Sequence, residues 1–298
     1  MGKEGVKMRM DDERESANVD DRRASSGYSG GMPSMGTMMM FWPLIKPLLR
    51  SKFGMFIIGA GVVAYMMGYN PLALLGMGGG IASGHVDTVK DEKEAVFIKK
   101  VLASTEDVWS KHLRGYRAPI MVLYRGSTRS GCGHASAQMG PFYCPVDQKV
   151  YLDLGFFDEL AKRHGAPGDF AQAYVLAHEI GHHIQNMQGT LDKVQRMKQG
   201  WGGSSRKANA LQVRVELQAD CYAGVWANLA HRQFHILEPG DVEEALRAAS
   251  SIGDDTLQKE AGRAVRPDAF THGSSQQRLE WLKRGLESGD MRQCNTFG

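Results

Sequence analysis

The stretch His178-Glu179-Ile180-Gly181-His182 is an H-E-x-x-H sequence, and the rest of this 298-residue chain can be interpreted outward from it. On a helix, residues i and i+4 lie one turn apart on the same face, so the imidazoles of His178 and His182 can bind one Zn²⁺. Glu179 lies about 100° away around the helix, which places its carboxylate beside the metal, where a general base would stand. The stretch therefore predicts a hydrolytic zinc site, with two incidental histidines on a structural helix as the alternative.

The residues on both sides of the motif are typical of an amphipathic helix. A breaker run at residues 165–168 precedes Asp169, which can cap the helix, and Gly189 can close it. The apolar residues between them recur at helical spacing: Phe170, Tyr174, Ala177, Gly181 and Ile184. This setting favours a metal site over an incidental pair of histidines.

A catalytic zinc needs a third protein ligand, and the sequence offers one downstream. In metzincins the motif continues to a glycine and a third histidine, but this chain has Gln185 and Gln188 at those positions. Glu216 lies in a predicted helix over residues 207–230, and Asp220 one turn later can accept the free N–H of a ligand histidine. We therefore expect Glu216 to be the third ligand and Asp220 to lie behind the site, with a solvated helix face as the alternative.

The charge of the chain argues against a nucleic-acid partner. The formal net charge is +3 and the pI is near 8.6. No cluster of Lys and Arg with interleaved aromatic residues occurs in the sequence. Such a cluster would be the footprint of a nucleic-acid surface, so we expect none.

Four cysteines permit three disulfide pairings. Cys132 and Cys144 are close enough in sequence to close one loop, which leaves Cys221 to pair with Cys294. Cys221 is about 140° from Glu216 around the predicted helix, so we expect it to point away from the metal. Four free, buried thiols are the alternative.

The sequence before the predicted catalytic part indicates a tail and a membrane anchor. Residues 1–45 are first rich in charge and then in Ser, Gly and Met, so we expect a disordered tail. Residues 46–86 contain an uncharged run from 53 to 84 that ends in a Gly-rich linker. Its apolar part is at the short end of the about 20 residues that a membrane helix needs, so it predicts one transmembrane helix, with a buried core helix as the alternative.

The charges beside this run predict the orientation of the chain. Lys46, Arg50 and Lys52 precede the run, and Asp87 is the first formal charge after it. By the positive-inside rule we expect a single-pass inner (plasma) membrane protein with a cytoplasmic N-terminus. Residues 87–298 would then lie in the periplasm or outside the cell, where disulfides form.

The remaining segments predict a small sheet with helices. Residues 88–113 have the pattern of an amphipathic helix, and two β-prone runs lie at 120–124 and 149–154. Prolines flank residues 142–144, which fits an edge strand. We expect an extended peptide substrate to pair with a free edge at residues 133–138.

Several stretches together resemble a known family. The H-E-x-x-H run is accompanied by residues 140–145 (GPFYCP), 216–226 (ELQADCYAGVW) and 272–278 (HGSSQQR), and residues 8–23 carry a further likeness. In these stretches the chain resembles the bacterial neutral zinc metallopeptidases of the YpfJ type, over nearly its whole length. The resemblance implies a zinc peptidase and names no substrate.

The chain is also similar to the gluzincin peptidases, especially the membrane-bound HtpX type. Those proteins have a Glu-x-x-x-Asp helix and, downstream, Thr-His-Pro followed by an arginine. Here Thr271-His272 is followed by Gly273, a departure, while Arg278 stands where the pattern expects it. This similarity implies that His272 and Arg278 assist near the zinc, whereas a histidine beside a helix cap is often structural.

We therefore expect a membrane-anchored zinc endopeptidase with an α+β, zincin-like domain over residues 87–298, preceded by one transmembrane helix. Its cofactor would be Zn²⁺, its substrate a peptide or protein, its general base Glu179, and its oxyanion donor His272. One rival is a zinc-stabilised, non-catalytic scaffold or assembly factor at the membrane, and another is a tethered binding module without metal. A structural zinc usually takes four protein ligands and has no use for Glu179, which favours the enzyme.

Overall fold

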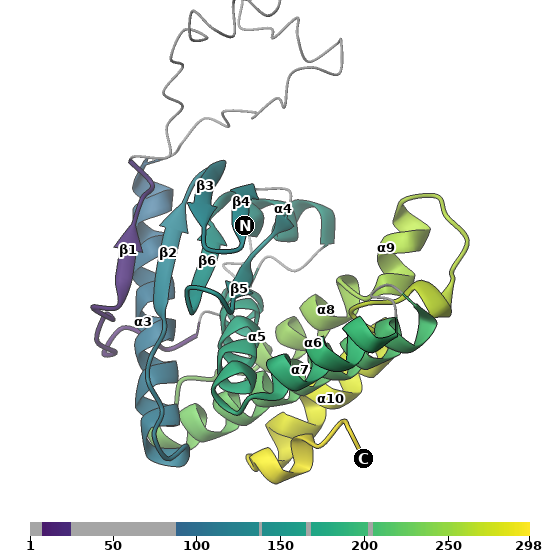
Figure 1. Cartoon of the computed structure of the whole chain (residues 1–298). Helices are drawn as coiled ribbons and strands as arrows, with labels where there is room; N and C mark the ends of the chain where they lie inside the picture. The colour runs from purple at the N-terminus through teal and green to yellow at the C-terminus, as the bar shows by residue number, and fades with distance from the viewer. Residues whose placement is uncertain (1–7, 25–87, 137–138, 165–167, 202–204) are drawn as a thin grey trace, which may run out of the picture. The chain divides into compact units, whose positions relative to one another are not determined.

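The computed structural model describes residues 8–24, 88–136, 139–164, 168–201 and 205–298. These residues all belong to one compact unit, in which a small sheet packs against helices (Figure 1). The expected α+β class with a small sheet is therefore present.

A four-stranded sheet has the order β1-β2-β6-β5. The pairs β1–β2 and β2–β6 are parallel, whereas β5 runs antiparallel to β6 and forms the far edge (Figure 1). The bounds of the strands are β1 Val19–Asp21, β2 Ile120–Tyr124, β5 Phe142–Cys144 and β6 Lys149–Asp153. A separate antiparallel pair is formed by β3 Ser127–Ser130 and β4 Gly133–Ser136.

Strand β2 is apolar throughout because both of its faces are covered. Met121 and Leu123 belong to the main core, whereas Val122 and Tyr124 lie in a second cluster that also contains Ala135 of β4. Successive side chains of a strand point to opposite faces, so this division follows from the backbone. A continuous apolar run is what a strand between two parallel neighbours requires.

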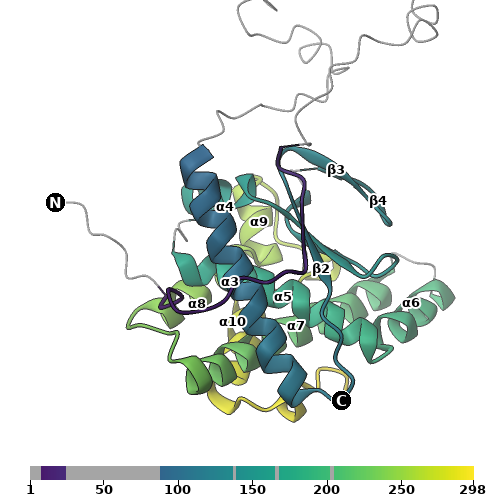
Figure 2. The same cartoon turned by 90° about the vertical axis from the view of Figure 1, so that its left-hand side faces the viewer.

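The helices supply most of the main core, on the face of the sheet that carries Met121 and Leu123. Their bounds are α3 Thr88–His112, α4 Gly155–His164, α5 Asp169–Met187, α6 Thr190–Gly200, α7 Arg206–Phe234, α8 Asp241–Ser251, α9 Asp254–Glu260 and α10 Ser275–Ser288. Figure 2 shows α3 in front of α5, α7 and α10, and its Ile98 and Leu102 are buried in the same core as Leu152 of β6. Helix α10 begins with the capping box of Ser274 and Gln277, which fixes where its first residues lie.

Three glycines let the central helices approach closely. A Cβ on Gly181 of α5 would lie 3.0 Å from the backbone of Ala219 on α7. Between α7 and α10, a Cβ on Gly224 would lie 2.2 Å from the Leu282 carbonyl, and one on Gly285 would lie 2.0 Å from the carbonyl of Cys221. A Cβ cannot approach backbone as closely as it would at Gly224 or Gly285, so a larger residue there would force α7 and α10 apart, whereas one at Gly181 would require α7 to shift by a few tenths of an ångström. This packing places side chains of α5, α7 and α10 within hydrogen-bond distance of one another.

The N-terminal segment is part of this unit, so the expectation of a disordered tail over residues 1–45 is wrong for residues 8–24. Strand β1 pairs with β2 from Val19↔Met121 to Asp21↔Leu123. Met8 and Met10 are buried in the main core. Glu106 of α3, itself buried, accepts hydrogen bonds from Arg14, Ser16 and Asn18 at 2.9, 2.6 and 2.8 Å.

The prediction of a single-pass membrane protein is wrong as well. Within the described part of the chain, no helix is long and apolar enough to cross a bilayer. The predicted anchor, residues 46–86, lies outside the described residues. Independently, β1 is hydrogen-bonded to β2, so the segments on either side of that anchor lie in one unit. A single crossing between them cannot place the N-terminus in the cytoplasm and residues 87–298 on the other side of the membrane.

We predict that Met10→Ala lowers the free energy of unfolding by about 2–5 kcal/mol, because it removes a side chain from the core. Urea unfolding monitored by circular dichroism would measure this change. As a control, Val146→Ala alters a side chain that is 73% exposed and should change stability by less than about 0.5 kcal/mol. An unchanged stability of Met10→Ala would mean that the segment does not pack as described.

Candidate metal centre

Two histidines of α5 and one glutamate of α7 converge on one point. The Nε2 atoms of His178 and His182 each lie 3.3 Å from Oε2 of Glu216. The three potential ligand atoms all lie within 4.8 Å of one another, which makes this group a candidate metal site. Ligand atoms about 2.0–2.1 Å from a tetrahedral zinc are roughly 3.3 Å apart, so the spacing fits Zn²⁺.

The other ring nitrogen of each histidine is held by an acceptor. His178 Nδ1 lies 2.7 Å from Oδ1 of Asp220, and His182 Nδ1 lies 2.9 Å from Oε1 of Gln185. Each Nδ1 therefore carries the proton, which leaves the Nε2 lone pairs available to a metal. Three protein ligands and no fourth are typical of a catalytic zinc.

The Asp220 carboxylate joins three helices behind the candidate ligands. It accepts hydrogen bonds from the Tyr174 hydroxyl of α5 at 2.6 Å and from Arg278 Nε and Nη2 of α10, both at 2.9 Å. Arg278 Nη2 also donates to the Tyr174 hydroxyl at 2.9 Å. Asp220 is fully buried and Arg278 is 3% exposed, so the pair lies in the protein interior. The structure thus brings Arg278 behind the site, where it contacts Asp220 and Tyr174 and its Nη2 lies 3.5 Å from His178 Nδ1.

These contacts shift the pKa values of the site. Burial alone would raise the pKa of Asp220, but Arg278 and His178 outweigh it and lower that pKa to about 2. Burial opposes a charge on His178, yet the Asp220 and Glu216 carboxylates raise its pKa to about 9. The pKa of Glu216 is held well below its usual value by the two histidines, in spite of burial. The metal-free site therefore holds two carboxylates against protonated imidazole.

Glu179 lies beside the ligands and is not one of them. It is buried at 7% exposure, and burial raises its pKa, while the adjacent histidines and a backbone hydrogen bond from Tyr143 oppose the rise. Burial therefore makes this carboxylate a better proton acceptor than an exposed one.

Strand β5 is fixed beside α5 by a second set of contacts. The Tyr143 hydroxyl accepts from Asn186 Nδ2 at 2.9 Å and lies 3.1 Å from His183 Nδ1. His183 Nε2 lies 2.6 Å from the carbonyl of Arg117 and must donate to it, so Nδ1 accepts from Tyr143. Burial also lowers the pKa of His183, which favours the neutral ring. His183 therefore holds β5 in place and is turned away from the metal site.

The candidate ligands open into a cleft of about 580 Å³. One wall is formed by residues 139–143, which lead into and include part of β5, and His272 and Arg278 also line the cleft. None of the described residues in the expected substrate edge, Gly133–Ser136, lines this cleft, whereas Phe142 and Tyr143 of β5 do. A larger cavity of about 1190 Å³ lies between the N-terminal segment and α3, and it shares no lining residue with the cleft.

His272 lies at the rim of the cleft on a loop that Asp254 organises. Asp254 Oδ2 accepts the backbone N–H groups of Thr271, His272 and Gly273 at 2.7, 2.7 and 3.0 Å, and Oδ1 lies 3.4 Å from His272 Nδ1. This contact raises the pKa of His272. Gly273 has φ +95°, which glycine adopts readily and proline, fixed near −65°, cannot. The loop geometry therefore explains the departure from Thr-His-Pro.

Sequence reasoning missed three residues of this centre: Tyr174, Gln185 and Asp254. Tyr174 stands one turn before His178, so its spacing would have placed it on the ligand face. In the sequence, Gln185 indicates only that the chain is not a metzincin. Asp254 gives no local signal, because its partners lie some 17 to 19 residues later in the chain.

Both disulfides have the pairing expected from the sequence. Cys132 is bonded to Cys144, and Cys221 is bonded to Cys294. The second bond joins α7 to the 3₁₀ turn Met291–Cys294 near the C-terminus. Cys221 is thus not available as a metal ligand.

Comparison with known proteins adds a relationship over nearly the whole chain. Residues 8–297 match the family described as "Putative neutral zinc metallopeptidase". The chain is 45% identical over 300 residues to the uncharacterized protein YpfJ of Escherichia coli K12, covering 98% of this chain and 99% of that protein. An uncharacterized protein of Mycobacterium tuberculosis H37Rv is 44% identical over 204 residues, which are 65% of this chain and 67% of that protein. No solved structure gives a significant match.

We predict that the metal-free protein binds Zn²⁺ more tightly as the pH rises from 7 to 9. Zinc must displace protons from His178, whose pKa is about 9, and from His182, whose pKa is also raised. Calorimetric titration in buffers of different ionisation enthalpy should detect proton release at pH 7 that diminishes toward pH 9. An affinity independent of pH in this range would contradict the assignment.

The same shift predicts the opposite trend for the stability of the metal-free protein. The folded pKa of His178 lies above its unfolded value of about 6.5, so the stabilisation is fully present below pH 6.5. This stabilisation should disappear as the pH rises through about 9. Urea unfolding of the metal-free protein across this pH range would measure the change.

Proposed function

Because the chain belongs to the neutral zinc metallopeptidase family, we propose that it is a zinc-dependent endopeptidase. The observation that carries the proposal is a three-ligand site, His178, His182 and Glu216, with the buried Glu179 adjacent and unligated. When bound, zinc would act as a Lewis acid that activates a water and polarises a carbonyl group. The remaining steps belong to the protein's own side chains.

Glu179 is the proposed proton carrier. Its carboxylate would take a proton from the water that attacks the peptide carbonyl and later deliver it to the leaving amine nitrogen. Its raised pKa supports this role, because burial makes the carboxylate a better proton acceptor than an exposed one. His272, which also lines the cleft, would donate a hydrogen bond to the developing oxyanion, and its contact with Asp254 would keep it oriented for that role.

The cleft suits an extended peptide with an apolar side chain. Strand β5 has β6 on one side and is the last strand of its sheet, so its other edge can pair with an added strand. Apolar side chains line the cleft around the candidate ligands: Phe142, Phe156, Val175, Leu191, Val215, Ile252 and Leu257. A peptide would gain main-chain hydrogen bonds from the strand edge and burial of one apolar side chain among these residues.

The main rival is a zinc-stabilised scaffold without turnover. A purely structural zinc is usually enclosed by four protein ligands, whereas the described residues offer three at this site, which opens into a cleft. Burying the Glu179 carboxylate also costs free energy that a scaffold would have no reason to retain. These two features favour the peptidase.

We predict a division among four variants of the site. His178→Ala, His182→Ala and Glu216→Ala should each lose zinc, because each removes one of three ligands. Glu179→Gln should keep zinc and lose turnover by at least about 100-fold, because the amide cannot accept the proton. Elemental analysis and cleavage of a peptide library would measure both quantities. If Glu179→Gln cleaves as fast as the native protein, the general base lies elsewhere, and zinc-loaded protein that cleaves nothing would favour the scaffold.

We predict that His272→Ala lowers kcat about 10²–10³-fold, as is typical for removal of one oxyanion donor, with little change in KM or zinc content. His231→Ala is the matched control, since His231 lies outside the cleft and caps a turn through the backbone of Leu237. A loss that appears only in KM would indicate that His272 binds substrate without stabilising the transition state.

A further inference from the structure

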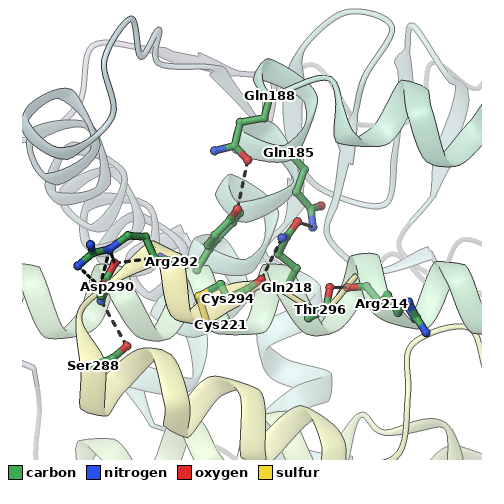
Figure 3. The surroundings of a disulfide bond; sticks show 11 residues. Gln185, Gln188, Arg214, Gln218, Cys221, Ser288, Asp290, Arg292, Cys294 and Thr296 are labelled. Carbon is green, nitrogen blue, oxygen red and sulfur yellow. Dashed lines mark hydrogen bonds and ion pairs between the residues drawn. A yellow bond between two sulfur atoms is a disulfide. The ribbon is translucent and has the colours of Figure 1, made fainter. Parts of the chain in front are cut away.

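Two buried glutamine amides connect the ligand His182 to the C-terminal disulfide. Gln185 Oε1 lies 2.9 Å from His182 Nδ1, and Gln185 Nε2 donates to Gln218 Oε1 at 3.0 Å. Gln218 Nε2 in turn donates to the carbonyl of Cys294 at 3.0 Å. Figure 3 shows these two side chains between α5 and the disulfide that joins Cys294 to Cys221. We call the series from Cys294 to His182 the amide chain.

Backbone carbonyls fix the direction of the amide chain. The Val215 carbonyl can only accept, and Gln185 Nε2 lies 2.7 Å from it. The Gln185 amide therefore cannot turn over, and its oxygen must face His182. The Cys294 carbonyl fixes the Gln218 amide in the same way, because it too can only accept. His182 must then carry a proton on Nδ1, so Nε2, which faces Glu216, is the ring nitrogen left to bind a metal.

The two histidine ligands are thus supported in different ways. His178 is held by the Asp220 carboxylate, which is itself paired with Arg278. The support of His182 is neutral, and it is buried, since Gln185 is fully inaccessible and Gln218 is 8% exposed. A buried polar network is rigid when all its hydrogen bonds are made, so the orientation of His182 depends on the whole amide chain.

We propose that Gln185 and Gln218 are positioning residues for His182 and that the Cys221–Cys294 disulfide anchors them. The proposal rests on the zinc site proposed above. The disulfide holds the Cys294 carbonyl against α7, and a hydrogen bond of 2.7 Å from the Thr296 hydroxyl to the Arg214 carbonyl holds the residues that follow (Figure 3). Effects should therefore decrease with distance from the metal, from Gln185 to Gln218 to the disulfide.

The first test compares Gln185→Met with Gln188→Met in the full chain. Met has nearly the shape of Gln without its amide, so Gln185→Met removes the acceptor for His182 Nδ1. Zinc should then dissociate to a chromogenic chelator about 10–100-fold faster, and the visible spectrum of the Co²⁺ form should change. Gln188 is the matched control, because it caps the same helix and accepts only from the Tyr222 hydroxyl among the described contacts. Equal zinc release by the two variants would overturn the proposal.

A second variant separates positioning from general stability. Gln185→Glu restores an acceptor for His182 but places an oxygen opposite the carbonyl of Val215. Because the acceptor is restored while the bonds to Val215 and Gln218 are lost, we expect it to melt at a lower temperature than the native protein and to release zinc more slowly than Gln185→Met. If Gln185→Glu and Gln185→Met release zinc equally fast, Gln185 acts only in folding and the proposal fails.

The third test addresses the far end of the amide chain. The double variant Cys221→Ala/Cys294→Ala should release zinc a few-fold faster. The double variant Cys132→Ala/Cys144→Ala should release it at the native rate, because no described contact links the Cys132–Cys144 bond to the amide chain. Equal effects of the two double variants would remove the disulfide from the proposal. His182→Ala distinguishes the premises: if it binds zinc as tightly as the native protein, the proposed metal site itself is wrong. If it loses zinc while Gln185→Met does not, only the amide chain is wrong.

Discussion

The pairing of Asp220 with Arg278 is the interaction on which the centre depends. An unpaired carboxylate at that depth would be very costly, and removing one partner of a buried pair typically destabilises a protein by about 3–5 kcal/mol. Here the Asp220 carboxylate is paired with Arg278 and also bonded to Tyr174 and His178, which offsets the cost of burying it. Helices α5, α7 and α10 therefore cannot separate without exposing a charge. The absence of side chains at Gly181, Gly224 and Gly285 is what lets the three helices meet there.

The charges of the centre are nearly balanced once a divalent cation is considered. Arg278 neutralises Asp220, which leaves the carboxylates of Glu216 and Glu179 facing the ligand position. Negative charge in a buried site attracts a dication more strongly than a monovalent cation at the same distance. The neutral support of His182 by Gln185 fits this balance, because a second supporting carboxylate would add a charge with no partner.

The parts of the structure that could be predicted are those encoded by local spacing. The i, i+4 histidines, the Glu216 and Asp220 pair and the strands near residues 120 and 149 all depend on periodicity within one element. The contacts of Asp254 and the folded structure of the N-terminal segment instead depend on partners outside their own element. That segment looked disordered because it is rich in charge, but several of these charges pair with α3, as Arg14 does with Glu106. The orientation argument failed for a related reason, since flanking charges carry no information about the pairing of β1 with β2.

The pairing of β1 with β2 also has a consequence for the order of folding. Val19 and Met121 are about 100 residues apart in sequence, so the sheet gains its outer strand only after a large loop has closed. During synthesis the first strand leaves the ribosome long before its partner, and Met8 and Met10 have no core to enter until α3 and β2 follow. Non-local pairings of this kind slow folding, so the N-terminal strand should be among the last elements to acquire its native contacts. A nascent chain of this protein would therefore expose Met8 and Met10 at least until β2, which ends at Tyr124, has been made.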